Sequence, residues 1–179
     1  MFYLALLRGI NVGGNNIVKM AELRTCLECA GLQKVSTYIQ SGNVLFESRS
    51  ASCSKLAQKV EQALAQELLP NANVVIVSSD QMAEVVNSAP TGFGAQPENY
   101  RYDVVFIRPP ASANELAGGI PLHPEVDKAW AQNGVIYLRQ LKARRTQSRL
   151  PKLVRTSAFK SMTVRNWATT TKLHELMRR

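Results

Sequence analysis

The residues best suited to binding chemistry lie in three short polar segments, the first of which is residues 8–16. Its sequence, RGINVGGNN, combines an arginine with glycines and asparagines. Glycine-rich loops let backbone N–H groups approach an anion, and a following helix adds a favourable dipole. The segment has neither the Lys-Ser/Thr pair of a P-loop nor the GxGxxG spacing of a dinucleotide-binding turn. It therefore predicts an anion-binding loop, with a tight crossover turn as the alternative.

The second and third segments carry amide and guanidinium groups. Residues 40–43 read QSGN, and Arg165-Asn166-Trp167 lies near the carboxyl end. Taken alone, QSGN is typical of a hairpin turn, and Asn166 is typical of a helix N-cap. Trp167 is expected in the core rather than as a stacking platform.

In their fuller context these segments read LLRGINVGG (residues 6–14), YIQSGNVLF (38–46) and TVRNW (163–167). Together they resemble the signatures of a bacterial family of small cytoplasmic proteins known only as a domain of unknown function. The resemblance spans nearly the whole chain. It implies two ferredoxin-like subdomains packed together and brings no established activity. It also favours one ligand-binding site between the subdomains, made by these residues: Arg8, Asn11, Gly13, Gly14, Gln40, Ser41, Asn43, Arg165 and Asn166.

A separate feature is the concentration of positive charge near the carboxyl end. Twelve of the 22 lysines and arginines, but one of the 13 acids, fall in residues 139–179, and the whole chain carries +9. Such a segment predicts a polyanion-binding face, with a solvated face that keeps the protein soluble as the alternative. We expect the following residues to make it: Lys142, Arg144, Arg145, Arg149, Lys152 and Arg155. Nucleic acid is the favoured partner and a small phosphate-bearing ligand the other, without a signature of base-specific recognition.

Other kinds of chemistry find little support in the sequence. Cys26 and Cys29 have CxxC spacing, but the predicted helix places them away from its N-terminus, where a redox pair gains reactivity. His123 and His174 lack the second ligand pair of a zinc site, and no nucleophile elbow is present. We therefore expect no metal or cofactor. Two alternatives to a binding protein stay open: an enzyme or sensor for a small anionic metabolite bound between the subdomains, and a structural module.

The elements that must position these residues alternate between strands and helices. Strands are predicted at residues 2–7, 35–40, 44–47 and 73–77, and helices at 19–30, 54–69 and 79–86. After a linker at 89–99 a similar order returns, with strands at 101–107, 126–130, 135–139 and 162–164, and helices at 112–118, 151–159 and 166–177. The repeated order predicts an α+β fold of two duplicated ferredoxin-like βαββαβ units, residues 1–90 and 100–179. The sequence leaves open whether residues 142–149 are ordered or form a mobile loop.

Composition also bears on location. No apolar run approaches the length of a membrane span, and the first residues lack the pattern of a secretory signal. Three cysteines without framework spacing favour a reducing compartment. The expectation is a cytoplasmic protein without a membrane partner, and the sequence indicates no oligomeric state.

Overall fold

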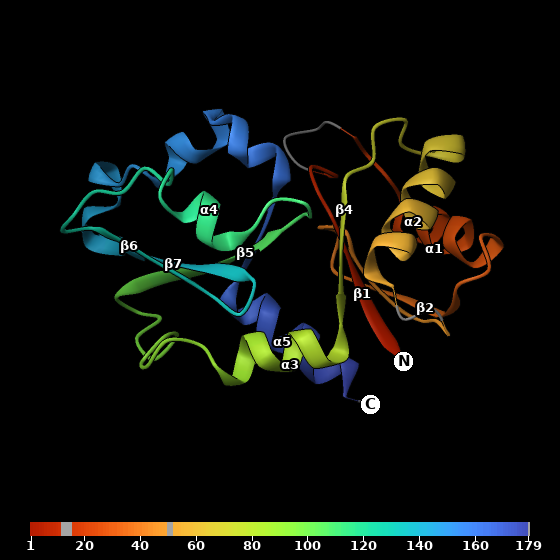
Figure 1. Cartoon of the computed structure of the whole chain (residues 1–179), viewed down its shortest axis with the longest axis horizontal. Helices are drawn as coiled ribbons and strands as arrows, with labels where there is room; N and C mark the ends of the chain where they lie inside the picture. Colours follow the sequence, from red (N-terminus) through yellow and green to blue (C-terminus); the bar gives the residue numbers. More distant parts are fainter. Residues whose placement is uncertain (12–15, 50–51, 179) are drawn as a thin grey trace. The chain divides into compact units, whose positions relative to one another are not determined.

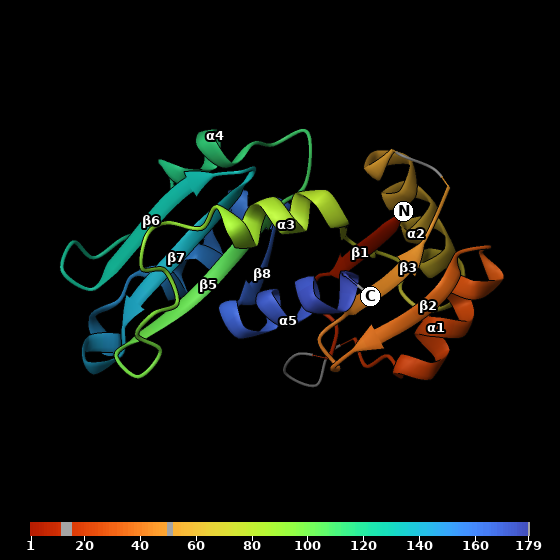
Figure 2. The same cartoon turned by 90° about the horizontal axis from the view of Figure 1, so that it is seen from below.

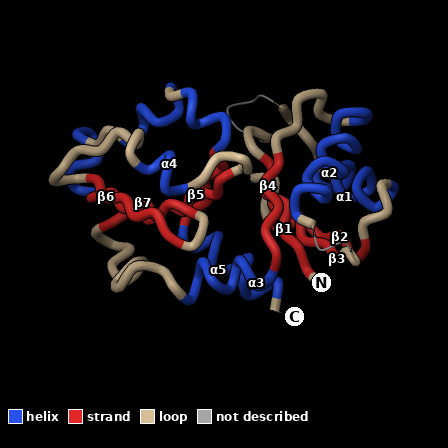
Figure 3. Tube along the Cα trace, in the orientation of Figure 1, coloured by secondary structure: helices blue, strands red, loops and turns tan. Residues whose placement is uncertain are grey.

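The structure is a computed structural model that describes residues 1–11, 16–49 and 52–178. Packing divides the chain into two units, Met1–Met82 with Leu173–Arg179, and Ala83–Lys172. Each unit contains a four-stranded antiparallel sheet with helices (Figures 1 and 3). The α+β prediction is confirmed, and the predicted domain bounds of 1–90 and 100–179 remain a prediction. Within the described residues, no helix is both long and apolar enough to cross a bilayer.

The first unit follows the order β-α-β-β-α-β. Its elements are β1 (Phe2–Leu7), α1 (Met20–Cys29), β2 (Gln33–Tyr38), β3 (Asn43–Glu47), α2 (Cys53–Glu67) and β4 (Val74–Ser78), after which α3 (Ser79–Asn87) runs into the second unit. The strand order β2-β3-β1-β4 is that of a ferredoxin-like unit. Helix α2 begins where the Ser52 hydroxyl accepts a hydrogen bond from the Lys55 backbone N–H. Leu23, Leu56 and Leu64 of the helices are buried with the inner side chains of β1.

The second unit repeats the strand order as β6-β7-β5-β8. Its elements are β5 (Tyr100–Ile107), α4 (Ala113–Ala117), β6 (Asp127–Gln132), β7 (Val135–Leu141), the 3₁₀ segments η1 (Lys142–Gln147), η2 (Leu150–Arg155) and η3 (Ser157–Ser161), and β8 (Met162–Asn166). Helix α5 (Trp167–Met177) begins in this unit, and its residues from Leu173 on belong to the first unit. Figure 2 shows β5, β6, β7 and β8 from a second direction. A capping box of Ser112 and Glu115 starts α4. Positive φ angles at Asn133 and Gly134 close the β6–β7 hairpin, as their sequence predicts.

The two faces of the second unit's sheet carry different residues because successive side chains alternate along each strand. Val105, Ile136 and Leu138 point to one face, where they are buried with Ala113 of α4 and with Leu153 of η2. The opposite face, which we call the aromatic face, carries the remaining alternate side chains. It includes the following residues: Tyr100, Tyr102, Lys128, Trp130, Tyr137 and Arg139.

The prediction of an α-helix over residues 151–159 is wrong. Two short 3₁₀ segments, η2 and η3, replace it, and Thr156 between them has extended backbone angles of φ −81° and ψ 149°. Pro151 stands in the first turn of η2, where its missing N–H breaks no helical hydrogen bond, so the helical run ends at the extended backbone of Thr156. For residues 142–149, whose order the sequence leaves open, the structure gives η1 over Lys142–Gln147, with a kink at Arg144 (φ −119°, ψ 26°).

Candidate functional site

A cavity of about 760 Å³ lies in the second unit at the amino-terminal end of β5. Strand β8 pairs with β5 from Met162 opposite Ile107 to Asn166 opposite Asp103. In the described register, residues 100–102 of β5 therefore have no strand partner on that side. The volume falls within the roughly 300–1,000 Å³ range of small-molecule sites. Aromatic, cationic, polar and small residues line it: Tyr100, Tyr102, Trp167, Arg101, Lys142, Arg145, Gln140, Asn166, Thr171, Gly94, Pro97 and Ala168.

The aromatic side of this cavity belongs to a larger cluster centred on Phe93. The Phe93 ring meets the rings of Tyr102, Tyr137 and Trp167 edge-on, with centroids 4.9, 5.2 and 5.1 Å apart. These distances and angles are the ones that aromatic pairs prefer, so the cluster holds its rings in defined orientations. Trp167 is half-buried, with part of its indole lining the cavity.

Gly94 shows why residues 89–99 are more than a linker. Its φ of 83° lies in the left-handed region, and a Cβ added there would overlap the indole of Trp167. Both conditions require glycine at this position. The segment therefore forms a close-fitting wall of the cavity rather than a simple connection between units.

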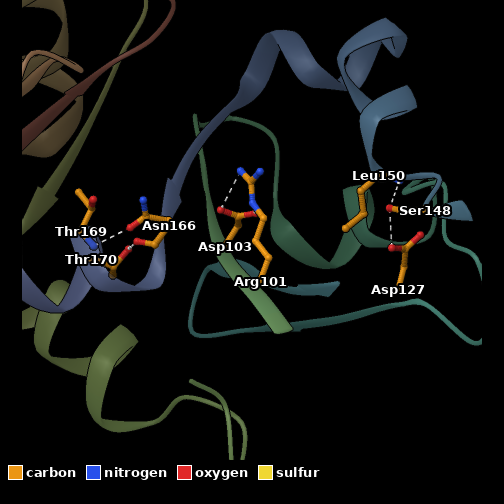
Figure 4. A network of polar contacts seen from close by, with 8 residues as sticks. All are labelled: Arg101, Asp103, Asp127, Ser148, Leu150, Asn166, Thr169 and Thr170. Carbon is orange, nitrogen blue, oxygen red and sulfur yellow. Dashed lines mark hydrogen bonds and ion pairs between the residues drawn. The ribbon is translucent and has the colours of Figure 1, made fainter. Parts of the chain in front are cut away.

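The three cationic side chains of the cavity differ in the hydrogen bonds and ion pairs that they make within the protein. Arg101 makes a two-pronged ion pair with Asp103, at 2.7 Å from Nε to Oδ2 and 3.3 Å from Nη2 to Oδ1 (Figure 4). Lys142 donates from Nζ to the Pro97 carbonyl at 2.5 Å. The Arg145 guanidinium is exposed and has no hydrogen bond or ion pair to any described residue. Arg145 is therefore the cation with most of its capacity left for an anion.

Asn166 has a structural role beside its place in the cavity wall. Its Oδ1 accepts a hydrogen bond from the Thr169 backbone N–H at 2.7 Å, and its carbonyl accepts one from Thr170 Oγ1 (Figure 4). The prediction that Asn166 caps the last helix is confirmed. The Nδ2 group of this exposed residue has no partner within the described parts of the chain, so a ligand in the cavity can accept its protons.

Arg165, the neighbour of Asn166 in the same motif, has a different environment. It lies on β8 opposite Val104 and is not part of the cavity lining. Its Nη1 donates to the Val164 carbonyl at 2.9 Å, and burial lowers the pKa of its guanidinium to about 10. Arg165 therefore stays charged at neutral pH within a partly dehydrated setting.

Within the basic segment, two arginines are used by the fold itself. Arg144 forms an ion pair with Glu125 at 2.8 Å and also donates to Gln147. The same contact with Arg144 lowers the pKa of the Glu125 carboxyl. Arg149 donates from its backbone N–H to Asp127 and from its guanidinium to the Leu122 carbonyl.

Lys152 and Arg155 complete the set predicted for polyanion contact. Both are exposed on η2, and residues three apart in a 3₁₀ helix lie one above the other. The described structure gives neither side chain a hydrogen bond or an ion pair. Of the six predicted cations, Lys142 and Arg145 lie at the cavity, while Lys152 and Arg155 form a separate exposed pair.

Asp127 explains how the basic segment is held in place. Its buried carboxylate accepts a hydrogen bond from Ser148 Oγ at 2.6 Å (Figure 4). It also accepts from the backbone N–H groups of His123 and Arg149 at 2.9 and 2.8 Å. Ser148 Oγ in turn accepts from the Leu150 N–H. A single acid on β6 thereby anchors the junction between η1 and η2.

In the first unit, the motif residues contact one another. The Asn11 side chain donates to the Val18 and Gln40 carbonyls at 3.0 and 2.9 Å and accepts from the Val18 N–H at 2.8 Å. Asn43 is fully buried and donates to the Tyr38 carbonyl and to Ser41 Oγ. The structure thus gives these amides internal partners, and their predicted ligand contacts stay a prediction.

The remaining residues of the first two motifs fall into three groups. Arg8 is half-buried, and loss of hydration lowers the pKa of its guanidinium. The side chain of Gln40 is exposed. Gly13 and Gly14 lie outside the described residues. The proposed meeting of these motifs with Arg165 and Asn166 in one site also remains a prediction.

Most of the aromatic rings at the cavity are not predicted as site residues from the sequence. Tyr100 and Tyr102 alternate with Arg101 in the run YRY, which is a signal for one ring-bearing strand face. Phe93 and Trp130 come from a different loop and strand, and only the fold brings them beside Tyr102 and Trp167. No linear pattern contains all of these rings.

Comparison with known proteins agrees with the fold. The chain is similar to the solved structure of conserved bacterial protein SP0830 from Streptococcus pneumoniae, with a TM-score of 0.84 and 25% sequence identity over 99% of this chain and 98% of the other. No curated protein matches the chain. A family model described as "protein of unknown function (DUF1697)" matches residues 1–137, which include the first two motifs. The chain therefore belongs to the DUF1697 family.

Proposed function

We propose that the second unit binds a ligand that carries both a phosphate and an aromatic base, and that nucleic acid is its favoured source. One observation carries this proposal: three cations and three aromatic rings line the same cavity of about 760 Å³. Arginine and lysine bind phosphate, and nucleobases stack on tyrosine and tryptophan. A purely electrostatic anion site has no need for the rings.

The positions of the polar groups fit the two ends of a nucleotide. Arg145 and Lys142 belong to η1 and supply positive charge for the phosphate. Tyr100 and Trp167, which are half-buried, supply ring surface for the base, with the Asn166 amide of the same lining as a donor to ring nitrogen or oxygen atoms. Asp103 is held in its ion pair with Arg101, which reduces its repulsion of an anion.

A small anionic metabolite is the second candidate for the same cavity. The observation that favours it is the size of the cavity, which suits one small molecule as well as one nucleotide of a chain. The cavity lining includes no aspartate, glutamate, histidine or cysteine among the described residues, so a ligand-binding role is favoured over catalysis. The three free thiols suit a cytoplasmic protein.

Titration of tryptophan fluorescence with small ligands tests the proposal. We expect adenosine and uridine monophosphates to bind more tightly than ribose 5-phosphate, which has no base, or adenosine, which has no phosphate. Arg145→Gln should weaken mononucleotide binding by about tenfold, because a hydrogen bond to a charged group contributes roughly 1.5 kcal/mol or more.

The matched control is Arg24→Gln, which removes an exposed arginine of α1 in the first unit. This variant should bind mononucleotides as the parent protein does. Equal affinity for ribose 5-phosphate and mononucleotides would show that the protein does not recognise the base. Unchanged binding in Arg145→Gln would show that the nucleotide does not bind in this cavity.

A further inference from the structure

Beyond the cavity, the aromatic face carries a row of alternating rings and cations. The Arg139 guanidinium lies over the Tyr100 ring at 4.4 Å and over the Trp130 ring at 5.8 Å. The Lys128 ammonium group lies 5.0 Å from the centre of the Trp130 ring. We call Tyr100, Arg139, Trp130 and Lys128 the ladder.

The sheet register explains how the ladder forms. Lys128 of β6 is paired with Arg139 of β7, and Arg139 is paired with Tyr102 of β5. Paired residues of antiparallel strands project to the same face, so the cations and rings come from three neighbouring strands. Trp130 lies two residues after Lys128 and therefore shares its face.

The pairing of two cations calls for a counterion. Like charges directly opposite each other in a sheet are destabilising. Lys128 is exposed, Arg139 is half-buried, and the described structure gives neither of them a carboxylate partner. The rings of Tyr100 and Trp130 offset part of this repulsion through cation–π contacts. An anion bound along the ladder would offset the rest.

Tyr100 joins the ladder to the cavity because it lines the cavity and also lies beneath Arg139. We infer that the ladder extends the nucleotide cavity into a track for single-stranded nucleic acid, an inference that rests on the proposed function. Successive phosphates would contact Lys128 and Arg139, and an unpaired base would stack on the exposed part of Trp130. A duplex keeps its bases stacked inside, so it cannot use the rings in this way.

Affinity measured against strand length tests the inference. Fluorescently labelled oligouridylates of increasing length, from the mononucleotide to about eight residues, should bind progressively more tightly to the parent protein until the track is filled. Lys128→Gln should reduce this gain and leave affinity for the mononucleotide unchanged. Lys128→Gln should also make the negative slope of log affinity against log salt shallower by about 0.7 for single strands, and Lys128→Glu should make it shallower still.

A second variant examines the stacking contribution. Trp130→Leu should weaken octamer binding by about fivefold or more, the loss expected for one stacked base. The control is Lys59→Gln, an exposed lysine of α2 in the first unit, which should bind every length as the parent protein does.

The outcomes separate the track from the cavity. If the octamer binds no more tightly than the mononucleotide, or if Lys128→Gln binds all lengths normally, the track is overturned while the nucleotide cavity stands. If a duplex or a polyglutamate peptide binds as tightly as the octamer, the assignment to single-stranded nucleic acid is overturned. If mononucleotides do not bind at all, the proposed function itself fails.

Discussion

At the scale of single residues, polar motif side chains of the first unit act mainly on their own loops. The Asn11 amide connects its loop to Val18 and to the turn at Gln40. The Leu7 N–H donates to the Gly42 carbonyl at 2.8 Å, which joins the same two motifs through the backbone. These contacts give the motifs a physical reason to occur together.

Gly42 provides a test of that interlocking. Its φ is 74°, and a Cβ added there would lie 2.8 Å from the Leu7 Cβ and 2.9 Å from Ile10 Cγ1. We expect Gly42→Ala to lower the free energy of unfolding by about 3 kcal/mol, the sum of left-handed strain and overpacking. Gly9→Ala is the matched control, with a φ of 68° and open space around it. It should cost only about 1 kcal/mol in urea unfolding. Equal losses would show that crowding at the turn has no effect.

At the scale of secondary structure, the start of α5 joins stability to the candidate site. Asn166→Ala should lower the stability of the protein by about 1 kcal/mol, because the Thr169 N–H loses its cap. Asn166→Asp should keep the cap and favour the helix dipole, yet weaken nucleotide binding by placing a negative charge in the cavity wall. Urea unfolding and nucleotide titration of both variants measure the two effects separately. If aspartate binds the nucleotide as tightly as asparagine, the proposed donation from the Asn166 amide to the base is excluded.

Helix α5 also contains a pH-sensitive group. Burial, followed by the charge of Arg178, lowers the pKa of His174 below its usual 6.5. The unfolded chain therefore binds a proton more readily than the folded chain, and His174 should reduce stability as the pH falls below about 6.5. Urea midpoints measured from about pH 7.5 to pH 5 should fall less in His174→Gln than in the parent protein. His123→Gln is the control, and an equal effect of that change would contradict the assignment.

The elements show which parts of the fold can be predicted from sequence. Some elements can be predicted from their own local sequence. They are the apolar run of β1, the helical spacing of α2 and the Asn133-Gly134 turn. The η1 and η2 segments depend instead on the buried carboxylate of Asp127, which is distant in sequence from Ser148. This tertiary contact fixes residues 148 and 149, just before the predicted helix, and no local pattern indicates it.

The candidate site divides in the same way. Asn166, Lys142 and Arg145 are predictable because motif and charge can be read from the sequence directly. The rings are not, since Tyr102, Trp167 and Phe93 are distant in sequence and lie together only in the folded second unit. Their arrangement changes the interpretation of the basic segment from a charged face alone to a cationic site with stacking surfaces.

At the scale of the whole molecule, the net charge of +9 matters through where its cations lie. Arg144 is paired internally and Arg149 makes contacts within the fold. The exposed side chains of Arg145, Lys152 and Arg155 have no hydrogen bond or ion pair to a described residue. A polyanion would therefore meet only part of the basic segment, together with the ring-bearing surface. Such an interface combines strong salt dependence with a preference for unpaired bases.

Binding of a single-stranded oligonucleotide measured over a range of salt concentrations tests this account most directly. We predict a straight fall of log affinity with log salt at a slope of about −2 or steeper, and a slope about 0.7 shallower in Arg145→Gln. Duplex of the same length should bind more weakly than the single strand. Affinity that does not change with salt, or an Arg145→Gln slope equal to that of the parent protein, would contradict it.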